Sequence, residues 1–297
     1  MGESMTEARG PTQDELVLTS IFGFNTGPAR AYLLPLAEDA VFSEPDRLWW
    51  EDPPQDGGLY AISSIAFDRD GDGVDEVLTS SAISVDPPGR VQVLRTPGLE
   101  SADETWTGDY DTLCEVFGEN LHSGTGLFAP GSPSFLAGCG LNAARLGTLV
   151  IVPPLGPGEF GITDLSTRFI GEIPYDLFGR SAAHGDVNGD GHEDLIVGAP
   201  NWYGGQPSDS LLDIRTRGTV YLFYGPFDPG ATMTRQDAAA VWVGENVGDY
   251  FGWSVAAADL DGDGTDEIYA SAPMRPGVND DGEELRLAGA LYRLPAP

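Results

Sequence analysis

An acidic nine-residue pattern occurs three times in this chain, and it limits the possible fold more than any other feature. The copies begin at Asp68 (DRDGDGVDE), Asp186 (DVNGDGHED) and Asp259 (DLDGDGTDE), and an apolar run follows each copy. The glycines permit the positive φ angles that a tightly turned loop requires. Oxygen side chains on alternate residues of such a loop can converge on one hard cation, which takes about six to eight oxygen ligands. Three copies in one register therefore favour calcium loops over solvated acidic turns.

The expected ligands are the first, third, fifth, seventh and ninth residues of each copy, and the seventh would contribute its backbone carbonyl oxygen. The three sets are Asp68, Asp70, Asp72, Val74 and Glu76; Asp186, Asn188, Asp190, His192 and Asp194; and Asp259, Asp261, Asp263, Thr265 and Glu267. Asp75 and Asp266 precede two of the closing carboxylates and could replace them or remain in solvent. An EF-hand is excluded, because its loop is longer and lies between helices, whereas strands are expected here. The sequence thus predicts about three bound calcium ions.

The spacing of the copies predicts a repeat of about sixty residues, a period typical of propellers and other repeat arrays. The best-preserved unit spans 178–250 and contains four expected strands. Their sequences are FGRSAAHGD before the acidic loop, LIVGAP directly after it, and then GTVYLFY and AAVWVG. β-branched and aromatic residues are enriched in these segments, as they are in strands. Four strands in one unit are typical of a propeller blade.

Other units resemble this one, although two of them are incomplete. Residues 59–113 contain four strands and an acidic loop, whereas 114–177 keep the strands without the carboxylates and should bind no metal. Residues 251–297 end before a fourth strand, and 14–58 lack a first strand and a loop unless the polar N-terminal segment contains a weak strand. We therefore expect residues 1–297 to form a single all-β domain, a β-propeller of four-stranded antiparallel blades with about five units.

The charge of the chain excludes nucleic acid as a partner. The chain has 47 acidic residues and 15 basic ones, all of them arginine, which gives a formal net charge of −32. Nucleic-acid binding requires cationic side chains that neutralise phosphates. No segment is long and apolar enough to cross a membrane, so we expect no membrane insertion of this chain.

The two cysteines and the polar N-terminal segment indicate whether the protein is cytosolic or exported. Cys114 and Cys139 fit no zinc or redox motif, so they form either one structural disulfide or two buried free thiols. The first residues, MGESMTEARGPTQ, do not resemble a signal peptide. The protein is therefore either cytosolic or cut from a longer exported precursor. We favour export, because cytosolic calcium is too low to fill weak loops.

The sequence FG at 178–179, the loop that begins at Asp186 and the sequence GAP at 198–200 resemble the FG-GAP repeat of the integrin α-subunit β-propeller and its bacterial relatives. The sequence FG at 251–252 and the sequence AP at 272–273 give a second match, and the strand pattern extends the resemblance over nearly the whole chain. It implies calcium at blade-edge loops between the first two strands. It also raises the alternative that the units are part of a seven-bladed propeller. The inserted ligand-binding domain of some integrins has no counterpart here, so ligand recognition is not carried over.

We expect no enzymatic activity. Two of the three histidines, His184 and His192, flank an acidic loop, and the glycine spacing around Ser123 does not form a nucleophile elbow. A candidate partner-binding patch lies in a long insertion and consists of Trp202, Tyr203, Arg215 and Arg217, because aromatic residues and arginine are enriched at interfaces. The alternative is that these side chains pack against the rim of the propeller.

The predicted function is that of a calcium-binding propeller that serves as an extracellular or cell-surface adhesion or interaction module, with calcium in a structural role. Its ligand would be a protein or a carbohydrate of unknown identity. The alternatives are a non-catalytic structural or carbohydrate-binding part of a larger secreted protein, and a propeller associated with a hydrolase. A periplasmic location is the alternative to an extracellular one.

Overall fold

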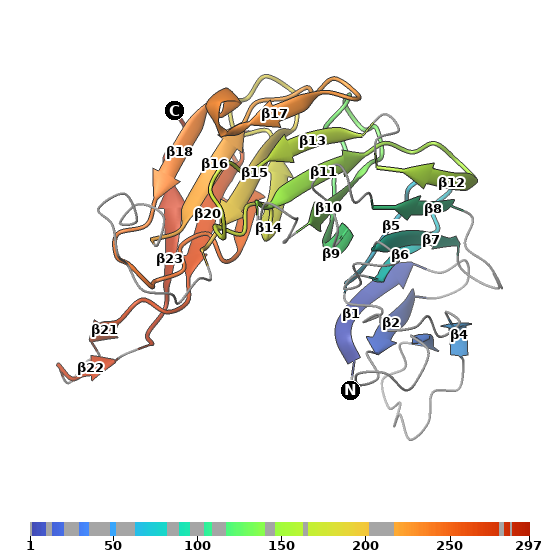
Figure 1. Cartoon of the computed structure of the whole chain (residues 1–297), viewed down its shortest axis with the longest axis horizontal. Helices are drawn as coiled ribbons and strands as arrows, with labels where there is room; N and C mark the ends of the chain where they lie inside the picture. Colours follow the sequence, from blue (N-terminus) through green and yellow to red (C-terminus); the bar gives the residue numbers. More distant parts are fainter. Residues whose placement is uncertain are drawn as a thin grey trace.

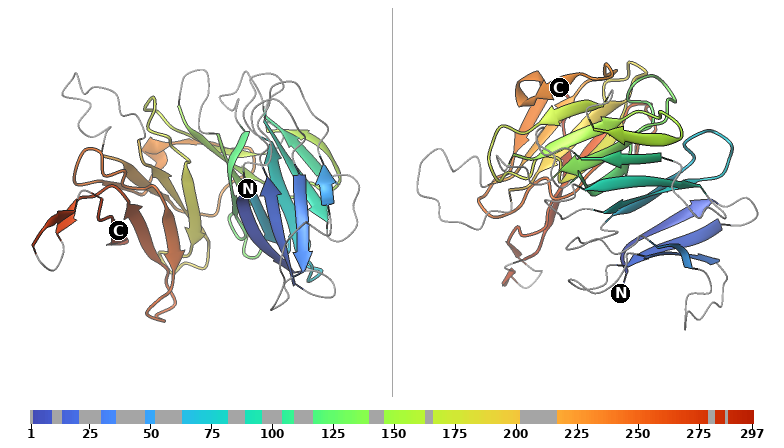
Figure 2. Two further views of the ribbon diagram at one scale, coloured as in Figure 1. Left: turned by 90° about the horizontal axis from the view of Figure 1, so that it is seen from below. Right: turned by 45° about the vertical axis from the view of Figure 1, so that its right-hand side comes forward.

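The computed structural model describes residues 63–81, 89–95, 104–108, 117–139, 146–162, 166–201, 217–278, 282–285 and 287–297, together with the backbone of four strands between Gly2 and Glu51. The described strands form five larger sheets that follow one another in chain order around an open arc, together with a separate two-stranded sheet (Figures 1 and 2). Within the described residues the one helical element is a short 3-10 helix, η1 (Arg235–Asp237). The predicted all-β fold built from propeller blades is confirmed. No helix in the described part of the chain has the length and apolar character needed to span a membrane.

The first sheet has one more strand than expected. Its order is β1-β2-β3-β4, formed by β1 (Gly2–Arg9), β2 (Asp14–Ser20), β3 (Arg30–Pro35) and β4 (Leu48–Glu51). The polar segment GESMTEAR thus supplies the first strand that the apolar pattern did not indicate, and it pairs antiparallel with β2. Pairing through backbone N–H and C=O groups does not require apolar side chains. The first unit therefore begins at Gly2 and has four strands, whereas the sequence pattern predicted an incomplete unit that begins at residue 14.

The main strands of the next four sheets pair antiparallel and repeat the same order, and two of these sheets gain a further short strand in parallel at one edge. The second consists of β5 (Ser64–Phe67), β6 (Glu76–Ser81), β7 (Arg90–Arg95) and β8 (Glu104–Thr107). The third consists of β9 (Phe117–Ser123), β10 (Phe135–Cys139), β11 (Thr148–Val152) and β13 (Thr167–Ile170). The fourth consists of β14 (Ser181–Gly185), β15 (Asp194–Ala199), β16 (Thr219–Phe223) and β18 (Ala240–Val243). The fifth consists of β19 (Val255–Ala258), β20 (Glu267–Ala272) and β23 (Ala290–Leu294), and a small hairpin of β21 (Gly277–Val278) and β22 (Glu284–Leu285) precedes β23.

The first strands of successive sheets lie next to one another on the inner side of the arc (Figure 1). Contacts join β1 with β5, β5 with β9, β9 with β14, and β14 with β19. The later strands of each sheet lie progressively further out, so the sheets are arranged as the blades of a propeller are. The turns between the first and second strands of the fourth and fifth sheets lie in contact with each other.

Two short strands connect neighbouring sheets. The connection from β11 to β13 contains β12 (Gly158–Gly161), which pairs in parallel with β8 of the preceding sheet. The connection from β16 to β18 contains β17 (Thr232–Thr234), which pairs in parallel with β13. Each strand covers the outer edge of the sheet before it, an edge that would otherwise expose unpaired backbone groups.

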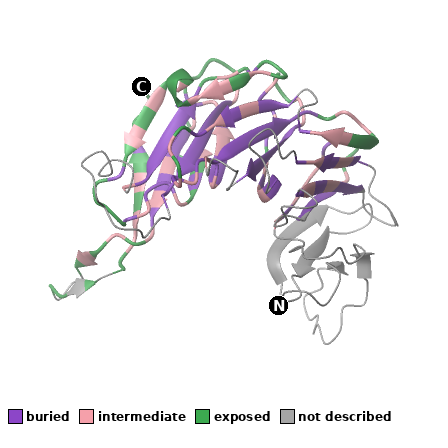
Figure 3. Cartoon of the chain, in the orientation of Figure 1, coloured by how far each residue is buried: buried purple, intermediate pink, exposed green. Residues whose placement is uncertain are grey.

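Three hydrophobic cores lie between successive sheets, and the buried strands form the middle of the arc (Figure 3). All six residues of β15 are buried: Leu195 and Val197 face the third sheet, and Ile196 faces the fifth. A strand buried on both faces has an apolar run instead of an alternating pattern. Each fully buried Leu, Ile or Phe side chain contributes about 1.5–3 kcal/mol.

The Phe-Gly pairs mark the seams between sheets. Phe178 packs against Gly147, the residue before β11, so closely that a Cβ atom on Gly147 would lie 2.0 Å from the Phe178 backbone oxygen. The same contact joins Gly218 to Phe251, where a Cβ atom would lie 2.1 Å from the Phe251 oxygen. Only glycine leaves room for this approach of two backbones. The repeated glycine before the third strand is therefore a packing feature of the repeat.

Candidate metal loops

Each acidic pattern forms the turn between the first and second strands of its sheet. Residues 68–75 join β5 to β6, 186–193 join β14 to β15, and 259–266 join β19 to β20. The fourth and sixth residues of each turn are glycines with φ between 75° and 92°. Side chains other than glycine rarely adopt this conformation. The alternation of glycine with oxygen-bearing residues is thus what allows the tight turn.

The first carboxylate of each loop stabilises the turn. It accepts hydrogen bonds from the backbone N–H groups of the fourth and sixth residues at 2.6–3.0 Å. Asp68 accepts them from Gly71 and Gly73, Asp186 from Gly189 and Gly191, and Asp259 from Gly262 and Gly264. The carboxylate is therefore held at the centre of its loop, with lone pairs left for a ligand.

The ninth residue closes each loop in the same way. Its carboxylate accepts the backbone N–H of the second residue at 2.8–3.1 Å. The pairs are Glu76 with Arg69, Asp194 with Val187, and Glu267 with Leu260. Glu and Asp both reach this position, so the longer side chain of Glu does not prevent closure. The three loops share one hydrogen-bonded framework.

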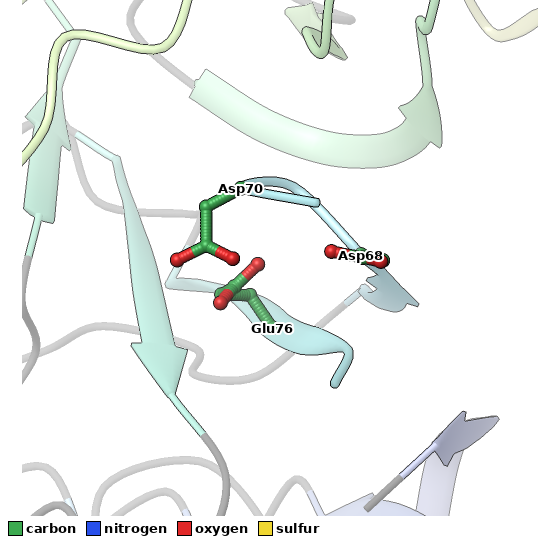
Figure 4. A group of neighbouring side chains, drawn as sticks. All are labelled: Asp68, Asp70 and Glu76. Atoms are coloured by element: carbon green, nitrogen blue, oxygen red, sulfur yellow. The ribbon is translucent and has the colours of Figure 1, made fainter. Parts of the chain in front are cut away.

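Two loops bring three acidic side chains together. Ligand atoms of Asp68, Asp70 and Glu76 all lie within 4.8 Å of one another, and Figure 4 shows the carboxylates of Asp70 and Glu76 close together. The same separation holds for Asp259, Asp261 and Asp263. Within the described residues the loop at 186–194, whose third residue is an asparagine, forms no such group of three acidic side chains.

In the loop at 186–194, the side chains are arranged around Asp190. Asn188 Nδ2 donates to Asp190 Oδ2 at 3.0 Å, and Asn188 Oδ1 accepts the Asp190 N–H at 2.9 Å. The Asp190 carboxylate in turn accepts the backbone N–H of His192 at 2.9 Å. The equivalent bond orients Val74 and Thr265 in the other two loops.

Asp194 is the most buried of the predicted ligands. It has no exposed surface, and its two oxygens accept the backbone N–H groups of Val187 and Gly225 at 3.1 and 3.0 Å. Burial raises the pKa of Asp194 to about 6, although these two hydrogen bonds act in the opposite direction. The carboxylates of Asp190 and Asp186 raise the pKa further by repulsion. A bound cation would offset both effects, because an adjacent positive charge favours the ionised carboxylate.

The donor set fits a hard cation. The predicted side-chain ligands are carboxylates and one amide, and such oxygen donors suit calcium, whereas thiolates and imidazoles suit softer metals. Asp70, Asp72 and Asp190 are exposed, so an ion could approach from solvent. The residues present therefore fit a calcium ion in each loop.

In two of the loops, the acidic residue in the eighth position contacts a group outside its own turn. Asp266 Oδ2 accepts the backbone N–H of Asp186 at 2.9 Å, and Glu193 Oε2 lies 2.8 Å from His184 Nδ1. Asp75 is buried, with 6% of its surface exposed, so it does not remain in solvent. Sequence reasoning left the roles of Asp75 and Asp266 open and did not single out Glu193. An acidic residue in the eighth position of all three copies was the available signal.

Sequence reasoning also missed two arginines beside the loops. Arg293 on β23 has Nη2 2.8 Å from Glu267 Oε1 and 3.3 Å from Asp261 Oδ2. Arg69, the second residue of the loop at 68–76, forms a buried ion pair with Glu104 on β8. Neither pair could be found from spacing, because each joins a residue of an acidic loop to a residue on a strand that is distant in the sequence.

The remaining predicted residues are only partly described. Cys139 is disulfide-bonded and buried, and Cys114, the other cysteine of the chain, lies outside the described residues. Trp202, Tyr203 and Arg215 also lie outside them. Arg217 is half-buried, and its backbone oxygen accepts the Phe251 N–H at 3.4 Å. The patch therefore stays a prediction.

The chain matches known proteins in agreement with this geometry. Residues 178–223 and 251–283 match the FG-GAP repeat. The chain is 27% identical to integrin alpha pat-2 of Caenorhabditis briggsae over 73% of its length, and 36% identical to integrin alpha-IIb of Mus musculus over 41%. It is 32% identical to phosphatidylinositol-glycan-specific phospholipase D of Rattus norvegicus over 41% of its length.

These alignments cover only a small part of each relative. The matched regions are 18%, 11% and 13% of the three proteins, respectively. The two FG-GAP matches contain the loops at 186–194 and 259–267, together with both Phe-Gly seams. Two segments of this all-β chain therefore match the FG-GAP repeat, and the chain is similar in sequence to integrin α subunits.

Proposed function

We propose that this chain is a calcium-stabilised propeller domain that serves as a non-catalytic interaction module, with one calcium ion in each of its three acidic loops. The observation that carries the proposal is the framework shared by the loops. In each, the first and ninth carboxylates are held by backbone N–H groups, and in two of the loops ligand atoms of three acidic side chains lie within 4.8 Å of one another. Three unrelated acidic turns would not be expected to share the same hydrogen bonds between backbone N–H groups and carboxylates.

Calcium would have a structural role at these turns. Several carboxylates brought together repel one another, and a divalent cation offsets that repulsion while it ties the loop to the following strand. The loops lie at the surface, so we expect weak binding, with a Kd on the order of 10⁻⁴ to 10⁻³ M, as in extracellular modules. Such affinity suits a location outside the cell or at its surface, which the resemblance to integrin α subunits also implies.

The partner would be a protein, as the integrin resemblance suggests, and a carbohydrate is the alternative. The net charge of −32 argues against nucleic acid. The match to a phospholipase D supports a second possibility, in which the domain is a non-catalytic part of a larger secreted enzyme. In either case the propeller would supply binding and another part of the protein any chemistry.

The first experiment combines a metal count with thermal unfolding. We expect about three calcium ions per chain and a melting temperature in millimolar calcium well above that in excess chelator, since binding to the folded state alone stabilises it. Asp190→Ala should lower the melting temperature in calcium and leave the value in chelator nearly unchanged.

Asp228→Ala is the matched control, because Asp228 is exposed and lies outside the loops. It should behave as the unmodified chain does in both conditions. No bound calcium and no shift with chelator would contradict the proposed role of the loops. Equal losses for Asp190→Ala in calcium and in chelator would remove Asp190 from the ligand set.

A further inference from the structure

Two of the three acidic loops are joined to each other by a reciprocal pair of hydrogen bonds. The backbone N–H of Asp186 donates to Asp266 Oδ2 at 2.9 Å, and the backbone N–H of Asp266 donates to the backbone carbonyl oxygen of Asp186 at 2.9 Å. Asp186 opens the loop at 186–194, and Asp266 directly precedes Glu267, which closes the loop at 259–267. The position of each loop's backbone is therefore set in part by the other loop.

The loops also approach each other closely. A Cβ atom on Gly185 would lie 2.5 Å from Asp266 Oδ2 and 2.8 Å from the Ala257 Cβ atom. A Cβ atom on Gly189 would lie 3.0 Å from Thr265 Cγ2. Two glycines thus leave the room in which the second loop packs against the first.

The third loop provides an internal comparison. The loop at 68–76 belongs to the second sheet, and the third sheet, which has no acidic loop, separates it from the loop at 186–194. Of the three acidic loops, only those at 186–194 and 259–267 therefore belong to neighbouring sheets.

We propose that Asp266 is a positioning residue that couples calcium binding in the loops at 186–194 and 259–267, so that an ion in one loop raises the affinity of the other. The inference rests on the proposed function, because it requires both loops to bind calcium. An ion in the first loop orders Asp186, and through the two hydrogen bonds it orders Asp266 and the adjacent Glu267. The second ion then has less backbone to order, which is a source of positive cooperativity.

The charge of Asp266 acts in the same direction. Its carboxylate accepts a hydrogen bond from the first residue of the neighbouring loop, so its negative charge lies where the two loops meet. A negative charge there offsets part of the repulsion between two divalent ions. By linkage, each ion must change the affinity of the other by the same factor.

Calorimetric titration of the whole chain with calcium tests the coupling. Asp70→Ala disables the loop at 68–76 and leaves the two linked loops. Asp70→Ala/Asp261→Ala leaves only the loop at 186–194, and Asp70→Ala/Asp190→Ala leaves only the loop at 259–267. The coupling factor is the two-ion binding constant of the first variant divided by the product of the two single-loop constants.

We expect a coupling factor of about five or more, the lower end of typical coupling between sites. Adding Asp266→Ala to all three variants should lower the factor toward one, because it removes the carboxylate and its hydrogen bond but keeps the bond from the Asp266 backbone N–H. Asp266→Asn keeps an oxygen that can accept the Asp186 N–H, so it should retain part of the coupling that Ala removes. Asp266→Ser, whose side chain is too short to reach Asp186, replaces Asp266→Ala if that variant does not fold.

The possible results separate the two proposals. Calcium binding to each loop with a factor of one would overturn the coupling and leave the proposed function intact. A factor that Asp266→Ala does not change would overturn the role of Asp266. An absence of calcium binding in every variant would overturn the proposed function, and the coupling with it.

Discussion

Arg69 and Glu104 form a bidentate ion pair beside the first acidic loop, with Nη1–Oε2 and Nη2–Oε1 distances of 2.7 and 2.9 Å. Only 6% and 3% of their surfaces are exposed. Trp106 Nε1 also donates to Glu104, and Arg69 Nη2 donates to the Pro153 oxygen at 3.2 Å. The pair therefore ties the loop at 68–76 to β8 and to the connection that leads from β11 to β12.

Removal of one member of this pair should destabilise the protein strongly. We expect Glu104→Ala to lower the free energy of unfolding by about 3–5 kcal/mol, because it leaves the Arg69 charge buried without a partner. The double variant Arg69→Met/Glu104→Leu should lose much less, since it leaves no buried charge. Denaturant unfolding in excess chelator would measure both. Equal losses in the single and double variants would contradict this account.

Arg293 should weaken calcium binding at the loop at 259–267, since its guanidinium already pairs with Asp261 and Glu267. We expect Arg293→Gln to raise the calcium affinity of this loop about two- to fivefold, the factor that corresponds to an exposed ion pair of about 0.5–1 kcal/mol. Calcium titration in the Asp70→Ala/Asp190→Ala background isolates the loop. Arg275→Gln is the control, because Arg275 pairs with Glu245 outside the loops. An unchanged or lower affinity in Arg293→Gln would show that the arginine does not compete with calcium.

The acidic loops and the strands after them could be predicted because their signals are local. The glycine spacing indicates a turn, and an apolar run such as LIVGAP indicates a strand that is buried on both faces. The strand β1 could not be found in this way, since its polar sequence carries no such pattern and its pairing with β2 defines it. The same holds for β12 and β17, which depend on the free edge of a neighbouring sheet.

For the metal loops too, only the residues within each loop could be predicted from the sequence. The positions that should face an ion could be read from alternation within nine residues. Asp266 and Arg293 could not be assigned, because Asp266 contacts a loop about eighty residues away in the sequence and Arg293 reaches the loop from another strand. Sequence spacing describes a loop's own residues, whereas tertiary packing decides which neighbours contact it.

The seam between the third and fourth sheets should not tolerate a side chain at Gly147. A Cβ atom there would lie 2.0 Å from the Phe178 oxygen, a backbone atom that cannot rotate away. We expect Gly147→Ala to cost at least about 3 kcal/mol of the free energy of unfolding. Gly131→Ala is the control: no atom would lie within 4 Å of its Cβ, so only the left-handed φ of 71° should cost stability, about 1–2 kcal/mol. Denaturant unfolding of both variants would measure the difference, and similar losses would argue against a tight seam.

Asp176 should make stability depend on pH. It lies just before the Phe-Gly pair at 178–179, only 4% of its surface is exposed, and its carboxylate accepts the Phe178 N–H at 3.0 Å. Burial raises the pKa of Asp176 from 3.8 to about 7, although the Phe178 hydrogen bond and Arg235 act in the opposite direction. Between about pH 4 and 7 the folded protein therefore keeps a proton that the unfolded chain has released.

The free energy of unfolding consequently contains a contribution from Asp176 that is fully present below about pH 4 and is lost as the pH rises to about 7. Asp176→Asn removes this titration and keeps an oxygen that can accept the Phe178 N–H. We expect the stability of the variant relative to the unmodified chain to rise steadily over this range and to level off above it.

Denaturant unfolding from pH 4 to 8 in excess chelator would measure the difference, since chelation keeps calcium release from the loops out of the comparison. Asp228→Asn, at an exposed position, should follow the unmodified chain. A constant difference between Asp176→Asn and the unmodified chain would mean that Asp176 keeps the same pKa in the folded and unfolded states.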